Sequence, residues 1–169
     1  MSKRIRFITR TALIAALYMV LTHLQNLLLP ESTNMAIQFR ASEALCVLAF
    51  FTSAAVPGLS VGCLLFNLTS GSALPLDFLV GTAASLLAAL CMRRLRGVTL
   101  KGYPLPAMLM PALFNAFLVG WELTVYIGGG FWINALCVAI GELAVLLTLG
   151  SLLFYTLKSR GLDKRLFEN

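Results

Sequence analysis

Four long apolar runs constrain this chain more than any other feature of its sequence. They cover residues 11–29, 78–92, 105–127 and 131–157. A helix that spans the hydrocarbon core of a bilayer needs roughly 20 mostly apolar residues, and these runs approach or exceed that length. The chain is only 12% charged, whereas a soluble domain of this size carries about 25% charged residues. The sequence therefore predicts an all-α integral membrane protein.

The basic segment SKRIR precedes the first apolar run, which raises the question of a secretory signal peptide. The run is longer than a typical signal-peptide core and has no small-x-small cleavage site before the next polar stretch. We therefore expect an uncleaved first transmembrane helix, and a multi-pass protein of the cell (plasma) membrane.

The basic residues determine the predicted topology because they fall into three clusters. All but one of the 13 lie within residues 3–10, 93–101 and 158–165, and Arg40 is the exception. The positive-inside rule places the three clusters in the cytoplasm, so successive clusters are separated by an even number of membrane crossings. This topology also explains the net charge of +6 without nucleic acid as a partner.

Turn-forming residues then divide the chain into six predicted helices. The glycines of IGGGF permit a tight reversal near residue 129, and Pro30, the Pro57–Gly58 pair and the 70–75 segment favour four crossings before residue 93. The third predicted helix is barely long enough to span a bilayer. In a single membrane domain of residues 1–169, with both termini cytoplasmic, we predict helices at about 11–29, 42–56, 59–70, 76–92, 104–127 and 131–157.

Cysteine and histidine do not form a pattern that would bind a metal. Cys46, Cys63, Cys91 and Cys137 lie singly in apolar segments, there is no C-x-x-C pair, and His23 is the single histidine. We expect buried, unpaired cysteines and no metal or other cofactor in this chain. The sequence also lacks the G-x-x-x-x-G-K-[ST] motif, so transport driven by ATP would need energy from a partner.

Several acidic and amide side chains fall within or at the ends of the apolar helices. A charge at the bilayer centre costs about 2.5–3.5 kcal/mol on insertion scales, so such groups usually face a protein interior or a cavity. Asn115 and Glu122 are seven positions apart, which places them on one helical face. The residues in this group are Glu43, Asp77, Glu122, Glu142, Asn67, Asn115 and Asn134.

Most of these residues also have a simpler structural explanation. Asn67 and Asn115 could hydrogen-bond across a helix pair, and Asp77 could stabilise the start of the helix that follows Pro75. Arg40 and Glu43 are three residues apart and could pair with each other. Glu122 and Glu142 are harder to explain in this way, because no second intramembrane cation is available to them.

The polar side chains suit a flat ligand that is rich in hydrogen-bond donors. A carboxylate accepts two parallel N–H bonds, such as those from the ring N–H and exocyclic amine of a guanine-like edge. Amides such as Gln38 or Asn134 match a mixed carbonyl and amine edge, and a second carboxylate suits a cationic substituent. Trp121 and Trp132 could stack on such a ligand or lie in the interfacial aromatic belt.

Three stretches, AIQFRASEAL, PGLSVGCLLFN and FWINALCVAIGELAVLLTLG, resemble the QueT family of queuosine-precursor transporters, and the resemblance covers nearly the whole chain. It implies a six-helix S-component of an energy-coupling factor (ECF) transporter, which binds its substrate from outside the cell. The expected substrate is a 7-deazaguanine base, such as the aminomethyl form or queuine. The expected partners are a membrane T component and two cytoplasmic ATPases.

The resemblance also implies roles for particular residues. An S-component typically carries an A-x-x-x-A motif on its first helix for docking on the T component, and this chain has Ala12 and Ala16, with Ala15 beside them. Glu122 lies outside the similar stretches and is included because of its charge. We expect Arg40 to position Glu43 or to close an outer gate. The predicted substrate-binding residues are Gln38, Arg40, Glu43, Asn67, Glu122, Asn134 and Glu142.

Three other functions remain open on the sequence. A stand-alone proton-coupled secondary transporter would use the same carboxylates as a proton relay, although no inverted repeat is obvious. An S-component for another vitamin-like heterocycle would share the same fold. An intramembrane enzyme would use Glu122 and Glu142 as acid and base, but neither cysteine nor histidine is clustered to act with them.

Overall fold

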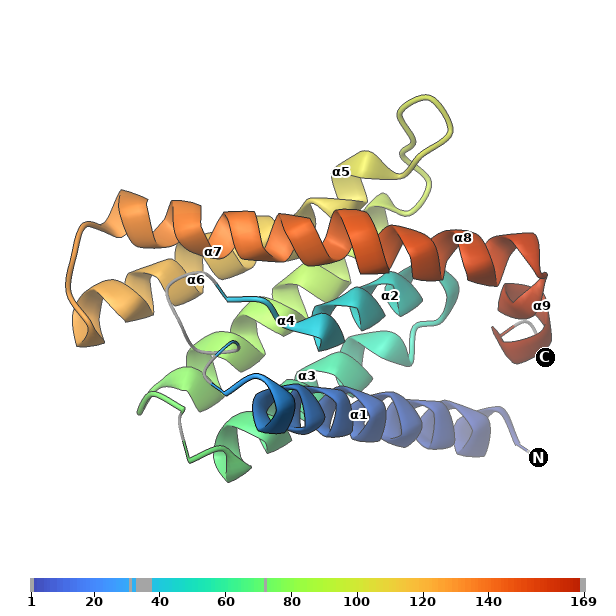
Figure 1. The fold of residues 1–169 in the computed structure, drawn as a ribbon. Helices are drawn as coiled ribbons and strands as arrows, with labels where there is room; N and C mark the ends of the chain where they lie inside the picture. The colour runs from blue at the N-terminus through green and yellow to red at the C-terminus, as the bar shows by residue number, and fades with distance from the viewer. Residues whose placement is uncertain (1, 31, 33–37, 72, 168–169) are drawn as a thin grey trace.

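The computed structural model describes residues 2–30, 32, 38–71 and 73–167 (Figure 1). This part of the chain is helical, with one isolated β-bridge between Leu100 and Tyr103, and it agrees with the predicted all-α class. Its elements are α1 (Lys3–Leu28), η1 (Ala41–Val47), α2 (Leu48–Phe51), α3 (Ala55–Thr69), α4 (Asp77–Leu95), α5 (Leu105–Met108), α6 (Met110–Tyr126), α7 (Phe131–Val145), η2 (Leu146–Gly150), α8 (Ser151–Ser159) and α9 (Leu162–Phe167).

In the described part of the chain, four helical segments are long and apolar enough to cross a membrane. They are Lys3–Leu28, Asp77–Leu95, Leu105–Tyr126 and Phe131–Ser159. Two shorter apolar segments, Ala41–Phe51 and Ala55–Thr69, occupy the positions of the second and third predicted helices. The six-crossing topology therefore stays a prediction, and it depends on whether these two shorter segments also count as crossings.

The break between the second and third predicted helices lies earlier than expected. It falls at residues 52–54, where Thr52 is extended (φ −137°, ψ 139°) and its hydroxyl oxygen accepts the Ala54 N–H at 3.3 Å. Pro57 instead lies in the first turn of α3, where a helix does not need its missing N–H. Gly58 serves packing rather than a turn, because a Cβ there would lie 2.9 Å from the Ile14 Cβ.

The longer helices form a row that curves around a short central segment. α1 packs against α3, α3 against α4, α4 against α6, and α6 against α7. The segment formed by η1 and α2 contacts α1, α4, α7, η2 and α8, so it lies inside this row. The polar residues at its start are therefore placed in the middle of the bundle.

One continuous helical segment, Phe131–Ser159, forms the last long element in Figure 1. Its middle part, Leu146–Gly150, is π-helical, and it contacts η1. Gly150 faces Met108 and Val47, whose nearest atoms would lie 3.3 and 3.5 Å from a Cβ at that position. Short π-helical segments are frequent at functional sites, and this one begins one turn after Glu142.

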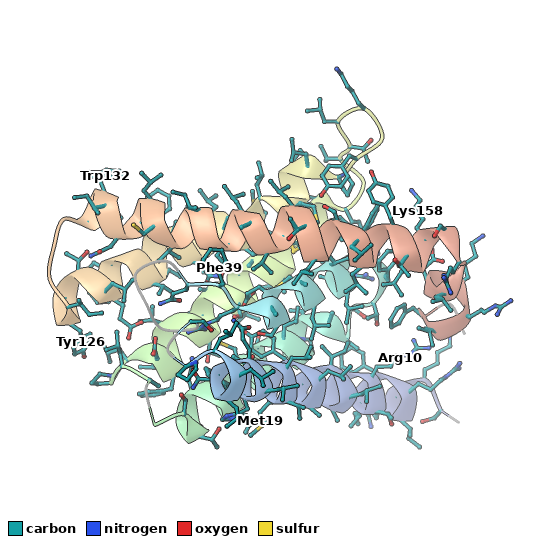
Figure 2. All side chains as sticks on the ribbon, in the orientation of Figure 1. Arg10, Met19, Phe39, Tyr126, Trp132 and Lys158 are labelled. Atoms are coloured by element: carbon teal, nitrogen blue, oxygen red, sulfur yellow. The ribbon has the colours of Figure 1, made fainter. Side chains whose placement is uncertain are left out.

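The three basic clusters meet at one end of the bundle. Figure 2 shows Arg10 and Lys158 at this end and Tyr126 and Trp132 at the other. The Arg10 guanidinium donates to the Phe167 carbonyl at 3.2 Å, which joins the first helix to the last. This arrangement is the one that the positive-inside rule requires, and the cytoplasmic location of both termini stays a prediction.

Candidate substrate-binding site

Buried polar side chains gather in the centre of the bundle. Their residues are almost inaccessible to solvent: Gln38 is 4% exposed, Arg40 5%, Glu43 1%, Glu122 0% and Glu142 2%. They come from the segment that leads into η1, from η1 itself, and from α6 and α7. We call these five residues the central polar cluster.

The start of η1 is held in place by α1. The Gln25 side-chain oxygen accepts the Ala41 N–H at 2.7 Å, and its amide nitrogen donates to the Phe39 carbonyl and to the Ser32 hydroxyl, the latter at 3.1 Å. These bonds satisfy backbone groups that a helix start leaves unpaired. Gln25 was not predicted, because a glutamine near the end of an apolar helix has no distinctive sequence signal.

Gln38 reaches the central polar cluster because a glycine on α7 lets its backbone approach. A Cβ on Gly141 would lie 2.9 Å from the carbonyl carbon of Gln38 and 3.2 Å from its nitrogen. Any other residue at position 141 would push the segment before η1 away from α7. Gly141 and Glu142 are adjacent, so this contact also places Gln38 beside one of the acidic residues.

Both carboxylate oxygens of Glu43 have hydrogen-bond donors. The Tyr18 hydroxyl donates to Oε1, and the Cys46 thiol donates to Oε2 at 3.1 Å. Tyr18 belongs to α1 and is fully buried. Its role was not predicted from the sequence, since a tyrosine within an apolar run is ordinary in a membrane helix.

Glu142 is only partly satisfied. The Asn115 amide donates to its Oε1 at 2.8 Å, which joins α6 to α7, while Oε2 has no hydrogen-bond partner in the described part of the chain. Glu43 and Arg40 are both close enough to interact with it electrostatically. Asn115 therefore forms the helix-pair hydrogen bond that its sequence position allowed, and its partner is a member of the central polar cluster.

Glu122 has no exposed surface, and its carboxylate lies beside the Asp77 carboxyl group and the Leu76 backbone without a well-aligned hydrogen bond among the described residues. It lies within electrostatic range of Asp77 and Arg40. Asp77 begins α4, as the sequence suggested, and its Oδ2 accepts the Leu74 N–H at 2.7 Å. Two neighbouring buried carboxyl groups cannot both ionise without cost, so the Glu122–Asp77 pair is suited to meet a cation or to share a proton.

Two predicted site residues make structural contacts outside the central polar cluster. The Asn67 amide donates to the Asp77 carbonyl at 2.7 Å and so joins α3 to α4, although Asn67 Oδ1 has no partner in the described chain. The Asn134 amide donates to the Thr124 hydroxyl and the Gly128 carbonyl, both at 3.0 Å, and fastens the turn between α6 and α7. The hydrogen bonds that both amide nitrogens donate are therefore contacts within the helix bundle.

Arg40 is the cation of the central polar cluster, and it faces several acids. It lies within electrostatic range of four buried carboxylates, those of Glu43, Asp77, Glu122 and Glu142. Its guanidinium carbon lies 5.8 Å from the centroid of the Phe66 ring. One arginine cannot neutralise four carboxylates in a low-dielectric interior, so the site can accept positive charge from a ligand or from protons.

The remaining predicted residues lie on the outside of the bundle or between helices. Ala12 and Ala16 are exposed on α1, but Ala15 is 4% exposed and its carbonyl oxygen would lie 2.9 Å from a Cβ on Gly62 of α3. Only two of the three alanines are therefore open to a partner. The tryptophans are 48% and 73% exposed, which fits the interfacial belt.

The cysteines are free thiols. Cys46 and Cys63 are buried, as expected, whereas Cys91 and Cys137 are only half-buried. Cys46 is the one that contributes to the site, through its hydrogen bond to Glu43.

Long apolar helices around a central cluster of buried ionisable groups define a class, the multi-pass membrane proteins with a functional site in their interior. Comparison with protein families then identifies the group within that class. The chain belongs to the QueT transporter family, whose family model matches residues 8–159. It is therefore a transport protein rather than an enzyme. No curated protein and no solved structure matches the chain significantly.

Proposed function

We propose that this chain is the substrate-binding S-component of an ECF-type importer, and that its substrate is a queuosine precursor. The substrate would be a 7-deazaguanine base that carries an amine, such as the aminomethyl form or queuine. A membrane T component would bind this chain, and two partner ATPases would supply the energy by hydrolysing ATP with Mg²⁺. Membership of the QueT transporter family supports the transport role.

The observation that carries the substrate proposal is the excess of acid around Arg40. Four buried carboxylates share this one arginine, and Glu122 lies beside Asp77 without a well-aligned hydrogen bond among the described residues. A protonated amine on the ligand would offset part of this charge, and the ring N–H and exocyclic amine would supply donors for a second carboxylate. Glu142 Oε2 offers a free acceptor for such a bond.

A pair of matched ligands tests this proposal. Calorimetry on the purified chain would compare 7-aminomethyl-7-deazaguanine with 7-methyl-7-deazaguanine, which has the same ring but no amine. We expect the aminomethyl base to bind about 10–100-fold more tightly, the range that a charged hydrogen bond supplies. Equal affinities, or no binding of either base, would remove the proposed role of the carboxylates. A wider panel of vitamin-like heterocycles would then identify another cargo.

The coupling proposal has its own test on α1. Ala12 and Ala16 are one helical turn apart and exposed, so they offer a flat surface that another helix can approach closely. Ala16→Trp is expected to abolish co-purification with a T component and to leave ligand binding unchanged. Leu21→Trp, on an exposed part of the same helix, is the control.

A stand-alone proton-coupled transporter is the second candidate function. The neighbouring Glu122 and Asp77 carboxyl groups favour it, since buried acids in membrane helices can carry a proton. This candidate predicts uptake of the base in cells that lack every T component, and it predicts that uptake collapses when the proton gradient is removed. An S-component would show no uptake in those cells.

A further inference from the structure

A second site lies at the basic end of the bundle, away from the central polar cluster. A cavity of about 220 Å³ opens there between the start of α1, the link from α2 to α3 and the end of α4. Four of its lining side chains are basic, and none of its described lining residues is acidic. The four basic residues are Lys3, Arg6, Arg10 and Arg93.

The guanidinium groups in this cavity are held by backbone carbonyls, which leave their charge in place. Arg10 donates to the Phe167 carbonyl at 3.2 Å, and Arg93 donates to the carbonyls of Ala49 and Phe50 at 3.2 and 3.4 Å. The Arg6 Nε is buried and has no hydrogen-bond partner among the described residues. A buried donor without an acceptor is unfavourable, so an acceptor supplied by a ligand would stabilise this arrangement.

The chemistry of the cavity suits a phosphate group. Guanidinium groups bind phosphate oxygens with paired hydrogen bonds, and lysine adds a further positive charge. The Thr52 and Ser53 side chains also line the cavity, and only Ala54 separates them from the start of α3. The N-terminus of that helix adds partial positive charge on the same side.

An apolar groove adjoins this cavity. Its volume is about 290 Å³, and it shares Arg10 and Phe167 with the basic cavity. The groove runs between α1 and α8. Apart from Arg10 and Phe167, the residues that line it are aliphatic. Among the side chains that form these walls are Leu13, Ile14, Leu17, Leu45, Leu153 and Leu157.

We propose that the cavity and the groove together bind one anionic phospholipid. The phosphate would lie among Arg6, Arg10 and Arg93, and one acyl chain would lie in the groove. Charge complementarity selects the headgroup, and the continuous apolar wall selects a lipid over a free phosphate, which would leave the groove empty. This proposal does not depend on the substrate or on the coupling partners.

The charge half of the proposal is tested with two double variants of equal net charge. The chain in phosphatidylcholine nanodiscs would be titrated with phosphatidylglycerol, and the bound lipid would be counted by native mass spectrometry. The variant R6Q/R93Q is expected to bind about 25-fold more weakly, from about fivefold for each removed charge. The control R94Q/R96Q changes neighbouring residues that do not line the cavity, and it is expected to bind normally. Equal losses in both variants would indicate only a diffuse basic belt and would overturn the site.

The apolar half is tested by blocking the groove while keeping every charge. Leu17→Trp is expected to weaken phosphatidylglycerol binding, whereas Leu21→Trp, which does not line the groove, is expected to leave it unchanged. Water-soluble glycerol phosphate is expected to bind far more weakly than the lipid. If it binds as tightly, or if Leu17→Trp has no effect, the ligand is a free phosphate ester and the lipid proposal is wrong. Thermal melting of each variant separates these outcomes from misfolding.

Discussion

The backbone of Gln38 lies directly against Gly141 of α7, close enough that a Cβ at position 141 would be 2.9 Å from the Gln38 carbonyl carbon. This contact holds Gln38 against α7 at the residue that precedes Glu142. The close approach of two backbones, rather than a side-chain contact, sets where Gln38 lies relative to α7.

Gly141→Ala is therefore expected to displace the segment before η1 and to weaken binding of the aminomethyl base at least tenfold. Crowding a tightly packed position costs about 1–3 kcal/mol, so the melting temperature should fall as well. Gly150→Ala is the matched control on the same helical segment, because its new methyl group would meet the flexible end of Met108 at 3.3 Å. Normal ligand affinity in Gly141→Ala would show that the contact with Gln38 does not shape the site.

Glu122→Gln is expected to stabilise the protein without ligand and to weaken ligand binding. The carboxyl group is buried beside that of Asp77, so a neutral amide of the same shape removes the repulsion between two acids and can donate a hydrogen bond to Asp77. The melting temperature should rise by roughly 2–4 °C for each kcal/mol added to the free energy of unfolding. In calorimetry the variant should lose its preference for the aminomethyl over the methyl base. A retained preference would place the amine elsewhere in the site.

Tyr18→Phe is expected to destabilise the fold and to disturb the site at the same time. The change leaves Glu43 Oε1 without its donor from α1, and an unsatisfied buried acceptor costs about 1–3 kcal/mol. Ligand affinity should fall because the Glu43 carboxylate is no longer oriented. Tyr126→Phe, at a half-exposed tyrosine on α6, is the control and should change neither quantity. If both variants behave alike, the Tyr18 hydroxyl does not position Glu43.

Two asparagine variants separate the site from the scaffold. Asn115→Ala removes the donor to Glu142 Oε1 and is expected to weaken ligand binding about tenfold, since hydrogen bonds to charged groups contribute about 1.5–3 kcal/mol. Asn134→Ala removes two hydrogen bonds of the turn between α6 and α7 and is expected to lower the melting temperature with little change in affinity. Calorimetry and thermal melting on both variants check this pair. If Asn134→Ala weakens ligand binding and Asn115→Ala does not, Asn134 rather than Asn115 contributes to the binding site.

Much of the architecture could be predicted because it depends on local composition. The apolar runs predicted the four long helices. The basic clusters predicted that the first and last helices have their basic ends on the same side, and the hydrogen bond from Arg10 to the Phe167 carbonyl joins these two ends. The boundary near Pro57 could not be predicted in the same way. A proline after a turn and a proline in the first turn of a helix look alike in a sequence, and the extended backbone of Thr52 decides between them.

The residues of the central polar cluster could be predicted, but most of their hydrogen bonds could not. Glu43 and Glu142 were noticed because lipid does not tolerate buried charge. Their partners Tyr18 and Asn115 lie 25 and 27 residues away along the chain, and Gln25 lies 16 residues from the backbone that it holds. Such pairs meet only when helices pack, so no local pattern marks them.

The sequence by itself determined that this chain is a helical membrane protein, that its three basic clusters share one end, and that its interior contains acids that require an explanation. Only the tertiary structure decided which acids are satisfied. Glu43 is held by Tyr18 and Cys46, whereas Glu122 lies beside the Asp77 carboxyl group without a well-aligned hydrogen bond among the described residues. The physical reason is that hydropathy reflects only the free energy of transferring each residue out of water. The free energy of a buried charge depends instead on the few atoms that surround it in the folded protein.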